Sequence, residues 1–166
     1  MAQITLGGNP TNTSGTLPTV GTQATDFTLT AVDLSSKNLT DYEGKRKILN
    51  IFPSVDTGVC ASSARTFNTQ AASLNNTQVL CISRDLPFAQ ARFCAAEGIE
   101  NIEMLSDFKD GSFGKDYGLT IIDGAFANLH SRVVMVLDEQ NKVLYTEQVP
   151  EIGQEPNYNA ALKILG

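Results

Sequence analysis

The feature that most constrains the fold of this chain is an alternation of apolar, strand-like segments with helical segments. Ile48–Phe52 is an apolar stretch that ends at Pro53, and Thr77–Ser83 is a second apolar stretch. Between them, the apolar residues of Val59–Leu74 recur at alternating spacings of three and four, which is typical of one helical stripe. Strands that are apolar along their whole length belong in sheets covered on both faces. These segments therefore predict a strand, helix, strand unit.

The rest of the chain continues this order. Further helices are expected at 85–97, 112–117 and 158–165, and further strands at 27–32, 102–105, 133–137 and 143–149, with polar connecting sequence at 37–47. The order predicts an α/β fold with a central mixed β-sheet flanked by helices, for which a thioredoxin-like arrangement is the simplest fit. Residues 1–24 predict an N-terminal β-hairpin or an irregular arm. We expect residues 1–166 to form a single domain.

Charge and hydropathy exclude several classes of function. The net charge is −6, whereas binding to a nucleic-acid backbone needs a basic patch. The longest apolar run, Val133–Leu137, is far shorter than the about 20 residues of a membrane-spanning helix. The first residues resemble no secretory signal, so we expect a cytoplasmic protein. In that reducing compartment, the three cysteines are expected to be buried, metal-bound or reactive rather than a permanent disulfide framework.

The most informative stretch is Phe52–Arg65, where a loop leads from a buried strand to Cys60 in the first turn of a helix. The free N–H groups and the dipole of a helix N-terminus favour a negative charge, so this position suits a reactive thiolate. The alternative is a structural role, because free cysteines are often small buried hydrophobic residues. Position alone leaves both interpretations open.

Pro53, Thr57 and Cys60 match the P-x-x-x-T-x-x-C signature of the peroxiredoxin family. The blocks KRKILNIFPSVDTGVC, VLCIS, DLPFAQ and RFC follow one another as in the bacterial thiol peroxidase branch, the atypical two-cysteine peroxiredoxins. The resemblance extends from about Phe27 to the C-terminus, and no signature position departs from the pattern. It implies a thioredoxin-like fold and the reduction of hydrogen peroxide and organic hydroperoxides, without a cofactor.

The resemblance also implies the roles of individual residues. Cys60 matches the peroxidatic cysteine, which a hydroperoxide oxidises to a sulfenic acid. Cys94 matches the resolving cysteine, which forms an intramolecular disulfide with Cys60, and thioredoxin is then the expected reductant. Thr57 can hydrogen-bond the peroxide or the thiolate, and its alternative role is a helix N-cap. Pro53 shapes and shields the loop. Arg132 matches the family arginine, whose fixed donors can hold thiolate and peroxide oxygens together.

Three further expectations concern the surroundings of these residues. Cys81 lies within an apolar strand, so packing explains it and we expect a structural role. Cysteines on two intact helices can lie too far apart for a disulfide, so local unfolding should accompany oxidation. Val55, Val59, Phe88 and Phe93 would favour alkyl or lipid hydroperoxides if they line the mouth of the site. The family resemblance also suggests a homodimer, with each active site inside one chain.

Other functions compete with this interpretation. A cysteine hydrolase would use Cys60 as nucleophile and His130, the only histidine, as base, although a lone surface histidine is the simpler interpretation. A thioredoxin-type exchanger loses support because the chain has no C-x-x-C motif. A redox sensor would begin with the same oxidation of Cys60 and therefore stays open. The cysteine and histidine spacings resemble no zinc site, and no phosphate-binding loop is present.

Overall fold

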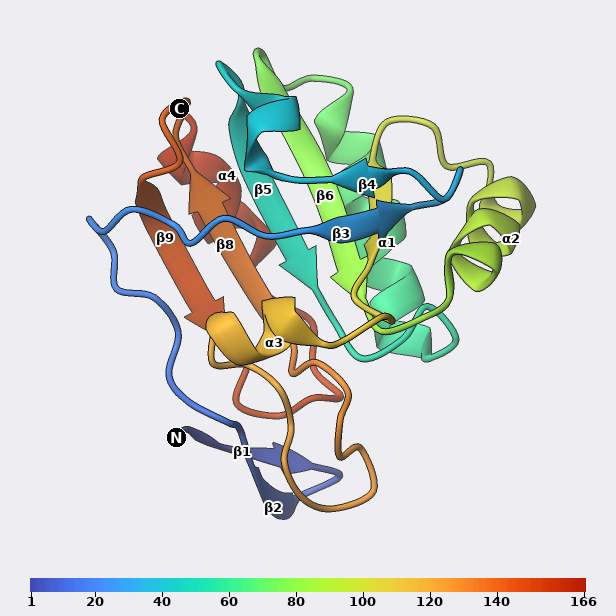
Figure 1. Ribbon diagram of the computed structural model, residues 1–166, viewed down its shortest axis with the longest axis vertical. Helices are drawn as coiled ribbons and strands as arrows, with labels where there is room; N and C mark the ends of the chain where they lie inside the picture. Colours follow the sequence, from blue (N-terminus) through green and yellow to red (C-terminus); the bar gives the residue numbers. More distant parts are fainter.

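A seven-stranded mixed sheet forms the centre of the computed structural model, which describes residues 1–166 (Figure 1). The strand order is β4-β3-β7-β6-β5-β8-β9, in which β5, β6 and β7 are parallel and the outer pairs are antiparallel. A separate two-stranded sheet, β1-β2, lies at the N-terminus. The strands are β1 (Gln3–Leu6), β2 (Asn9–Asn12), β3 (Leu29–Ala31), β4 (Ser36–Lys37), β5 (Arg46–Ile51), β6 (Thr77–Ser83), β7 (Glu103–Ser106), β8 (Val133–Leu137) and β9 (Val143–Gln148).

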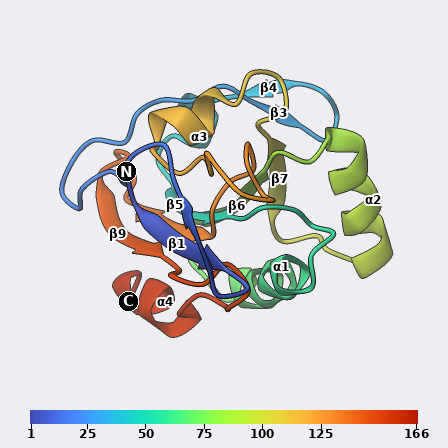
Figure 2. The same cartoon turned by 90° about the horizontal axis from the view of Figure 1, so that it is seen from below.

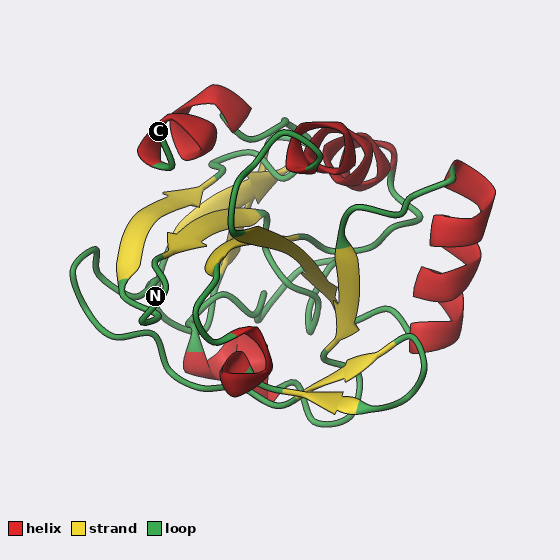
Figure 3. Ribbon diagram, turned by 90° about the horizontal axis from the view of Figure 1, so that it is seen from above, coloured by secondary structure: helices red, strands yellow, loops and turns green.

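Helices cover both faces of the sheet, as the apolar strands require. Seen from above, α1 and α4 lie on one side of the sheet and α3 lies on the other, while α2 flanks the sheet at its edge (Figure 3). The view from below shows α1 and α4 together on one side (Figure 2). The helices are α1 (Gly58–Ala71), α2 (Pro87–Glu97), α3 (Ser112–Asp116) and α4 (Tyr158–Ile164), with a 3-10 turn, η1 (Leu39–Tyr42). None of these helices has the length and apolar composition that crossing a membrane requires.

The residues of the central strands divide between two cores, one on each face. Leu49 and Ile51 of β5 pack in the core that includes Phe113 and Tyr117 beside α3, whereas Ile48 packs in the core that includes Cys60, Phe67 and Phe93. This division follows from the two-residue period of side chains along a strand. Both sides of β5 are therefore buried, and the strand fixes the position of the loop that follows it.

The structure confirms the predicted α/β fold with its central mixed sheet and the N-terminal hairpin. The turn between β8 and β9 contains Asn141, which adopts a positive φ of 67°. Two local expectations were wrong. The strand predicted at 27–32 is shorter, because β3 covers only Leu29–Ala31. The sequence at 37–47, expected to be connecting sequence, contains the last residue of β4, the turn η1 and the first two residues of β5.

The N-terminal hairpin is fastened to the loop that follows β9. The Glu151 carboxylate accepts hydrogen bonds from Thr5 Oγ1 at 2.8 Å and from the backbone N–H of Gly8 at 2.8 Å and of Gly153 at 2.8 Å. Gly7 and Gly8 have positive φ values of 58° and 83°, which direct the turn between the strands of the hairpin toward this carboxylate. These hydrogen bonds to its charged form lower the pKa of Glu151 from 4.5 to about 2.

We predict that acid releases the hairpin from this loop. Because the pKa of Glu151 is lowered in the folded protein, its contribution to stability is complete above pH 4.5 and is lost as the pH falls toward about 2. Hydrogen-exchange protection of the Gly7, Gly8 and Gly153 amides should fall over this range, while Leu49 in β5 serves as the internal reference. Glu151→Gln should show weak protection at every pH. Equal protection of the hairpin amides throughout this range would contradict the prediction.

Candidate active site

The loop between β5 and α1 places Cys60 at the start of a helix. Thr57 occupies the N-cap position with extended backbone angles, so Cys60 is the third residue of α1. The first intrahelical hydrogen bond runs from the N–H of Ala61 to the carbonyl of Thr57, at 3.0 Å. The N–H groups that precede Ala61 have no partner within the helix, which makes this end of α1 favourable for a negative charge. The Cys60 side chain is fully buried in this position.

Arg132 supplies a positive charge directly beside this sulfur. Its Nη2 donates a hydrogen bond to Cys60 Sγ at 3.2 Å, across 72 residues of sequence. Its Nε donates to the carbonyl of Ile152 at 2.7 Å, which fixes the plane of the guanidinium. Arg132 is 1% exposed, and its Nη1 has no hydrogen-bond partner. A guanidinium always carries its charge, so it stabilises negative charge on the sulfur and keeps one donor free for another oxygen.

Thr57 and Pro53 lie in the loop that leads to Cys60. The Thr57 hydroxyl donates to the carbonyl of Ser54 at 3.0 Å and makes no helix-capping hydrogen bond, although the residue holds the N-cap position. Its oxygen therefore keeps lone pairs that can accept a hydrogen bond. Pro53 is buried two residues after the end of β5. The structure thus brings Cys60, Thr57 and Arg132 to one end of α1.

A small cavity opens at this point. It has a volume of about 130 Å³, and Thr57, Val59, Arg132 and Ile152 contribute to its lining, together with Leu6, Gly58, Phe126 and Gly153. A neighbouring cavity of about 350 Å³ includes Val55 and Phe93. The sequence interpretation missed Leu6, Phe126 and Ile152, because nothing in a single sequence indicates that three distant segments meet. Val55, Val59 and Phe93 each line one of these cavities, whereas Phe88 lines neither and is 67% exposed, so the condition set from the sequence is not met for Phe88.

Cys94 lies on α2 and packs against the same core as Cys60. It is half-buried, and both thiols are free. Burial raises the pKa of the Cys94 thiol, so in this conformation it is protonated at neutral pH. Cys81, on β6, is fully buried and its Sγ accepts a hydrogen bond from Asn50 Nδ2 at 3.5 Å. Burial raises the pKa of Cys81 to about 12, which leaves it an unreactive thiol.

His130 is separate from this site. The sequence suggested a surface histidine, but His130 is fully buried. Its Nε2 lies 2.8 Å from Asp107 Oδ2. Asp107 also accepts hydrogen bonds from the backbone N–H groups of Phe113 and Gly114 at the start of α3. The hydrogen-bond partner of Cys60 is Arg132, so the structure does not contain the nucleophile and base pair that a cysteine hydrolase requires.

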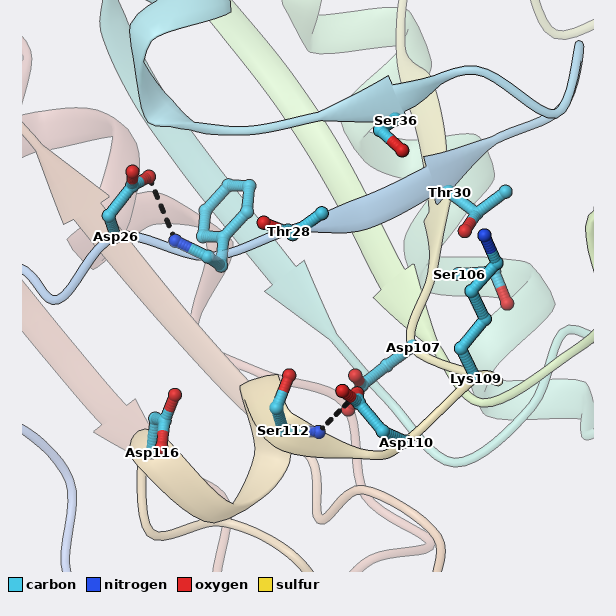
Figure 4. Close-up of a pocket in the computed structure, with 11 residues that line it drawn as sticks. Asp26, Thr28, Thr30, Ser36, Ser106, Asp107, Lys109, Asp110, Ser112 and Asp116 are labelled. Atoms are coloured by element: carbon cyan, nitrogen blue, oxygen red, sulfur yellow. Dashed lines mark hydrogen bonds between the residues drawn. The ribbon is translucent and has the colours of Figure 1, made fainter.

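A polar recess of about 330 Å³ lies beside β3 and α3 (Figure 4). Three of its aspartates accept hydrogen bonds from backbone N–H groups: Asp26 from Phe27, Asp107 from Phe113 and Gly114, and Asp110 from Ser112. It contains no thiol. No group of three or more His, Cys, Asp or Glu side chains in the protein is arranged to hold a metal ion. The three cysteines of the chain therefore lie outside this recess.

Arg65, on α1, forms an exposed ion pair with Glu97 of α2 at 3.2 Å and does not contact Cys60. Of these two arginines, only Arg132 contacts Cys60.

Comparisons with known proteins agree with this geometry. The redoxin family model matches residues 19–162. A thiol peroxidase from Mycobacterium tuberculosis is 58% identical over 166 residues, which is 100% of this chain and 99% of the relative. The crystal structure of a peroxiredoxin-like protein from Aquifex aeolicus superposes with a TM-score of 0.92 at 34% identity, covering 99% of this chain and 96% of the other.

A thiol peroxidase from Chromobacterium violaceum has the same fold, with a TM-score of 0.92 at 22% identity and coverage of 99% of this chain and 96% of the other. The matched region includes the strand, loop and helix that carry Cys60 and the strand that follows Arg132. The chain therefore belongs to the redoxin family, and within it to the thiol peroxidases of the peroxiredoxin type.

Proposed function

We propose that this chain reduces hydrogen peroxide and organic hydroperoxides through an intramolecular two-cysteine cycle. Cys60 is the peroxidatic cysteine, Cys94 is the resolving cysteine, and Thr57, Arg132 and Pro53 complete the site. The observation that carries the proposal is the hydrogen bond of 3.2 Å from Arg132 Nη2 to Cys60 Sγ, made between two buried side chains. A buried positive charge in contact with a sulfur is an arrangement for a thiolate.

In the first step, the Cys60 thiolate attacks the distal oxygen of the hydroperoxide. An S–O bond forms and the O–O bond breaks, so the sulfur becomes a sulfenic acid and the other oxygen leaves as water or an alcohol after taking up a proton. The free Nη1 of Arg132 can donate to this oxygen as negative charge develops on it. The Thr57 hydroxyl, whose hydrogen is directed at Ser54, can accept from the peroxide O–H. Buried Pro53 helps to keep water from the sulfur.

In the second step, the Cys94 thiolate attacks Cys60 Sγ. The S–S bond forms, the S–O bond breaks, and the hydroxide leaves as water after protonation. Burial raises the pKa of the Cys94 thiol, so the attacking thiolate forms readily only when α2 exposes this residue. Resolution is therefore coupled to a local opening of the protein.

A dithiol protein of the thioredoxin type reduces the disulfide and closes the cycle. This regeneration requires a reducing compartment, which agrees with the cytoplasmic location predicted from the sequence. The chain acts as one domain and assembles as a homodimer with a complete site in each protomer. The apolar residues Leu6, Val59, Phe126 and Ile152 at the cavity favour hydroperoxides that carry an alkyl group.

The cycle predicts the products of a single turnover. One equivalent of an organic hydroperoxide should remove two hydrogens from the reduced protein and link the Cys60 and Cys94 peptides. Cys94→Ser should stop at a sulfenic acid that a dione reagent traps, and Cys60→Ser should stay unmodified. Intact mass and peptide mapping measure all three products. If Cys60 stays reduced, the peroxidase proposal is wrong, and if oxidation occurs without rapid thioredoxin-dependent turnover, the protein is a sensor.

Arg132→Met is expected to lower kcat/KM for the hydroperoxide by about 100- to 1000-fold, because it removes donors to developing charge. The matched control is Arg65→Met, which removes an exposed arginine of α1 and should leave kcat/KM unchanged. A coupled assay with a thioredoxin system measures both variants, and circular dichroism checks their folding. A folded Arg132→Met protein with the activity of the Arg65→Met control would refute the role of the guanidinium.

Cys81→Ser is expected to keep turnover nearly intact. The pKa of about 12 leaves the Cys81 thiol protonated at neutral pH, and its surroundings are apolar strand residues. The hydroxyl of serine can accept the hydrogen bond from Asn50, so the cost should be limited to stability. Turnover and thermal unfolding of the variant measure the two effects. Loss of turnover in a protein of unchanged stability would assign Cys81 to the cycle.

A further inference from the structure

The segment that joins β6 to α2 contains a carboxylate that the proposed cycle does not use. Asp85 precedes α2, and its side chain accepts three hydrogen bonds: from Ser54 Oγ at 2.7 Å, from the Val55 N–H at 2.9 Å and from Ser83 Oγ at 2.7 Å. Two of these donors belong to the loop between β5 and α1. Asp85 therefore fastens the loop that leads to one cysteine to the start of the helix that carries the other.

The attachment of Asp85 continues into the site through Ser54. The carbonyl of Ser54 accepts the hydrogen bond of the Thr57 hydroxyl at 3.0 Å, and its Oγ accepts from the Asp56 N–H at 3.1 Å. Ser54 is thus held by Asp85 on one side and orders the turn before α1 on the other. Release of the Asp85 carboxylate would free both the loop and this turn.

On the other side, the start of α2 is held to the sheet. Gln90 is fully buried, and its Nε2 donates to Ser83 Oγ at 3.2 Å and to the carbonyl of Leu105 at 2.9 Å. The Ser106 hydroxyl donates to the carbonyl of Asp85. The sheet therefore provides a rigid base for the Asp85 carboxylate.

Two ion pairs also connect α2 to α1 and to the loop before it, but both are exposed. Arg92 of α2 pairs with Asp56 at 3.1 Å, and Arg65 of α1 pairs with Glu97 at 3.2 Å. Exposed ion pairs contribute little, whereas hydrogen bonds from neutral donors to a partly buried carboxylate are among the stronger ones. The Asp85 contacts are therefore the main polar connection that must break before the two segments separate.

From this geometry we propose that Asp85 is a positioning residue that controls the resolving step. Its carboxylate holds the Cys60 loop against the start of α2 and so keeps Cys94 from Cys60 until the segments open. A disulfide needs Cα atoms about 4.4–6.8 Å apart, so the bond forms only when the two segments bring Cys60 and Cys94 within this range. This inference rests on the proposed two-cysteine cycle. It adds that the strength of one set of hydrogen bonds sets the rate at which the sulfenic acid is resolved.

The Asp85 contacts would also decide between two fates of the Cys60 sulfenic acid. While the segments stay closed, a second hydroperoxide can oxidise the Cys60 sulfenic acid to a sulfinic acid, forming a second S–O bond and releasing water or an alcohol. Opening diverts the same intermediate to the disulfide. Asp85 therefore sets the ratio of sulfinic acid to disulfide at a given hydroperoxide concentration.

The test compares Asp85→Asn with the wild type and with Asp110→Asn. An asparagine amide keeps one acceptor oxygen but offers N–H groups in place of the second, so at least one donor from Ser54, Val55 or Ser83 loses its partner. Asp110 is a matched control, because its carboxylate also accepts a backbone hydrogen bond but lies away from both cysteines. Acid-quenched samples after rapid mixing with cumene hydroperoxide, with dione trapping and intact-mass analysis, give the amounts of sulfenic acid, disulfide and sulfinic acid over time.

The Asp85→Asn protein should form the disulfide roughly tenfold faster, as expected for the loss of one hydrogen bond to a charged group. Its ratio of sulfinic acid to disulfide should fall by the same factor, with Asp110→Asn matching the wild type. A merely structural role would lower the unfolding temperature without moving this ratio. A ratio that stays at the wild-type value, or slower resolution, would overturn the inference.

Ser54→Ala keeps the test decisive if Asp85→Asn does not fold. This variant retains the carboxylate and removes one of its three donors, so it should shift the ratio in the same direction by a smaller factor. No shift with Ser54→Ala would again overturn the inference. Failure of the two-cysteine cycle itself is distinguishable, because the wild type would then form no disulfide between Cys60 and Cys94 at all.

Discussion

A guanidinium buried against a sulfur is the interaction on which the rest of the site depends. Burying the charge of Arg132 is costly unless acceptors surround it, and the protein supplies the carbonyl of Ile152 and the sulfur of Cys60. The Ile152 carbonyl is itself placed by the loop that Glu151 fastens to the N-terminal hairpin. The hairpin, which stands outside the central sheet, is therefore part of the support of the active site.

The register of the sheet explains how Arg132 and Cys60 meet. Ile51, the last residue of β5, pairs with Val133, the first residue of β8, because the two strands are antiparallel. The loop that leaves β5 toward Cys60 and the residue that precedes β8 must then lie at the same edge of the sheet. β6 runs parallel to β5, so its carboxyl end lies at this edge as well. The segment from β6 to α2, which contains Asp85, therefore begins there. The Cys60 loop, Arg132 and the start of the helix that carries Cys94 therefore lie at one edge.

Local patterns predicted most of the secondary structure. The helical stripe before Leu74, the apolar strand around Cys81 and the proline and glycine at the ends of α2 identify their elements through side-chain period and backbone preference, which depend only on nearby residues. The same reasoning failed for His130, because burial of a polar side chain depends on what packs against it. It also could not show whether Phe88 lies at the mouth of the site, and the fold leaves this residue exposed outside both cavities.

The sequence by itself determined the α/β order, the position of Cys60 at a helix start and, through the resemblance in Pro53, Thr57 and Cys60, the family. Only the tertiary structure decided which groups surround that sulfur: the guanidinium of Arg132, the carbonyl of Ile152, the apolar wall that includes Leu6, and the carboxylate of Asp85 that connects the two cysteine segments. The physical reason is that contacts within an element follow the local period of the chain. Contacts between elements follow strand pairing and packing, which no local pattern specifies.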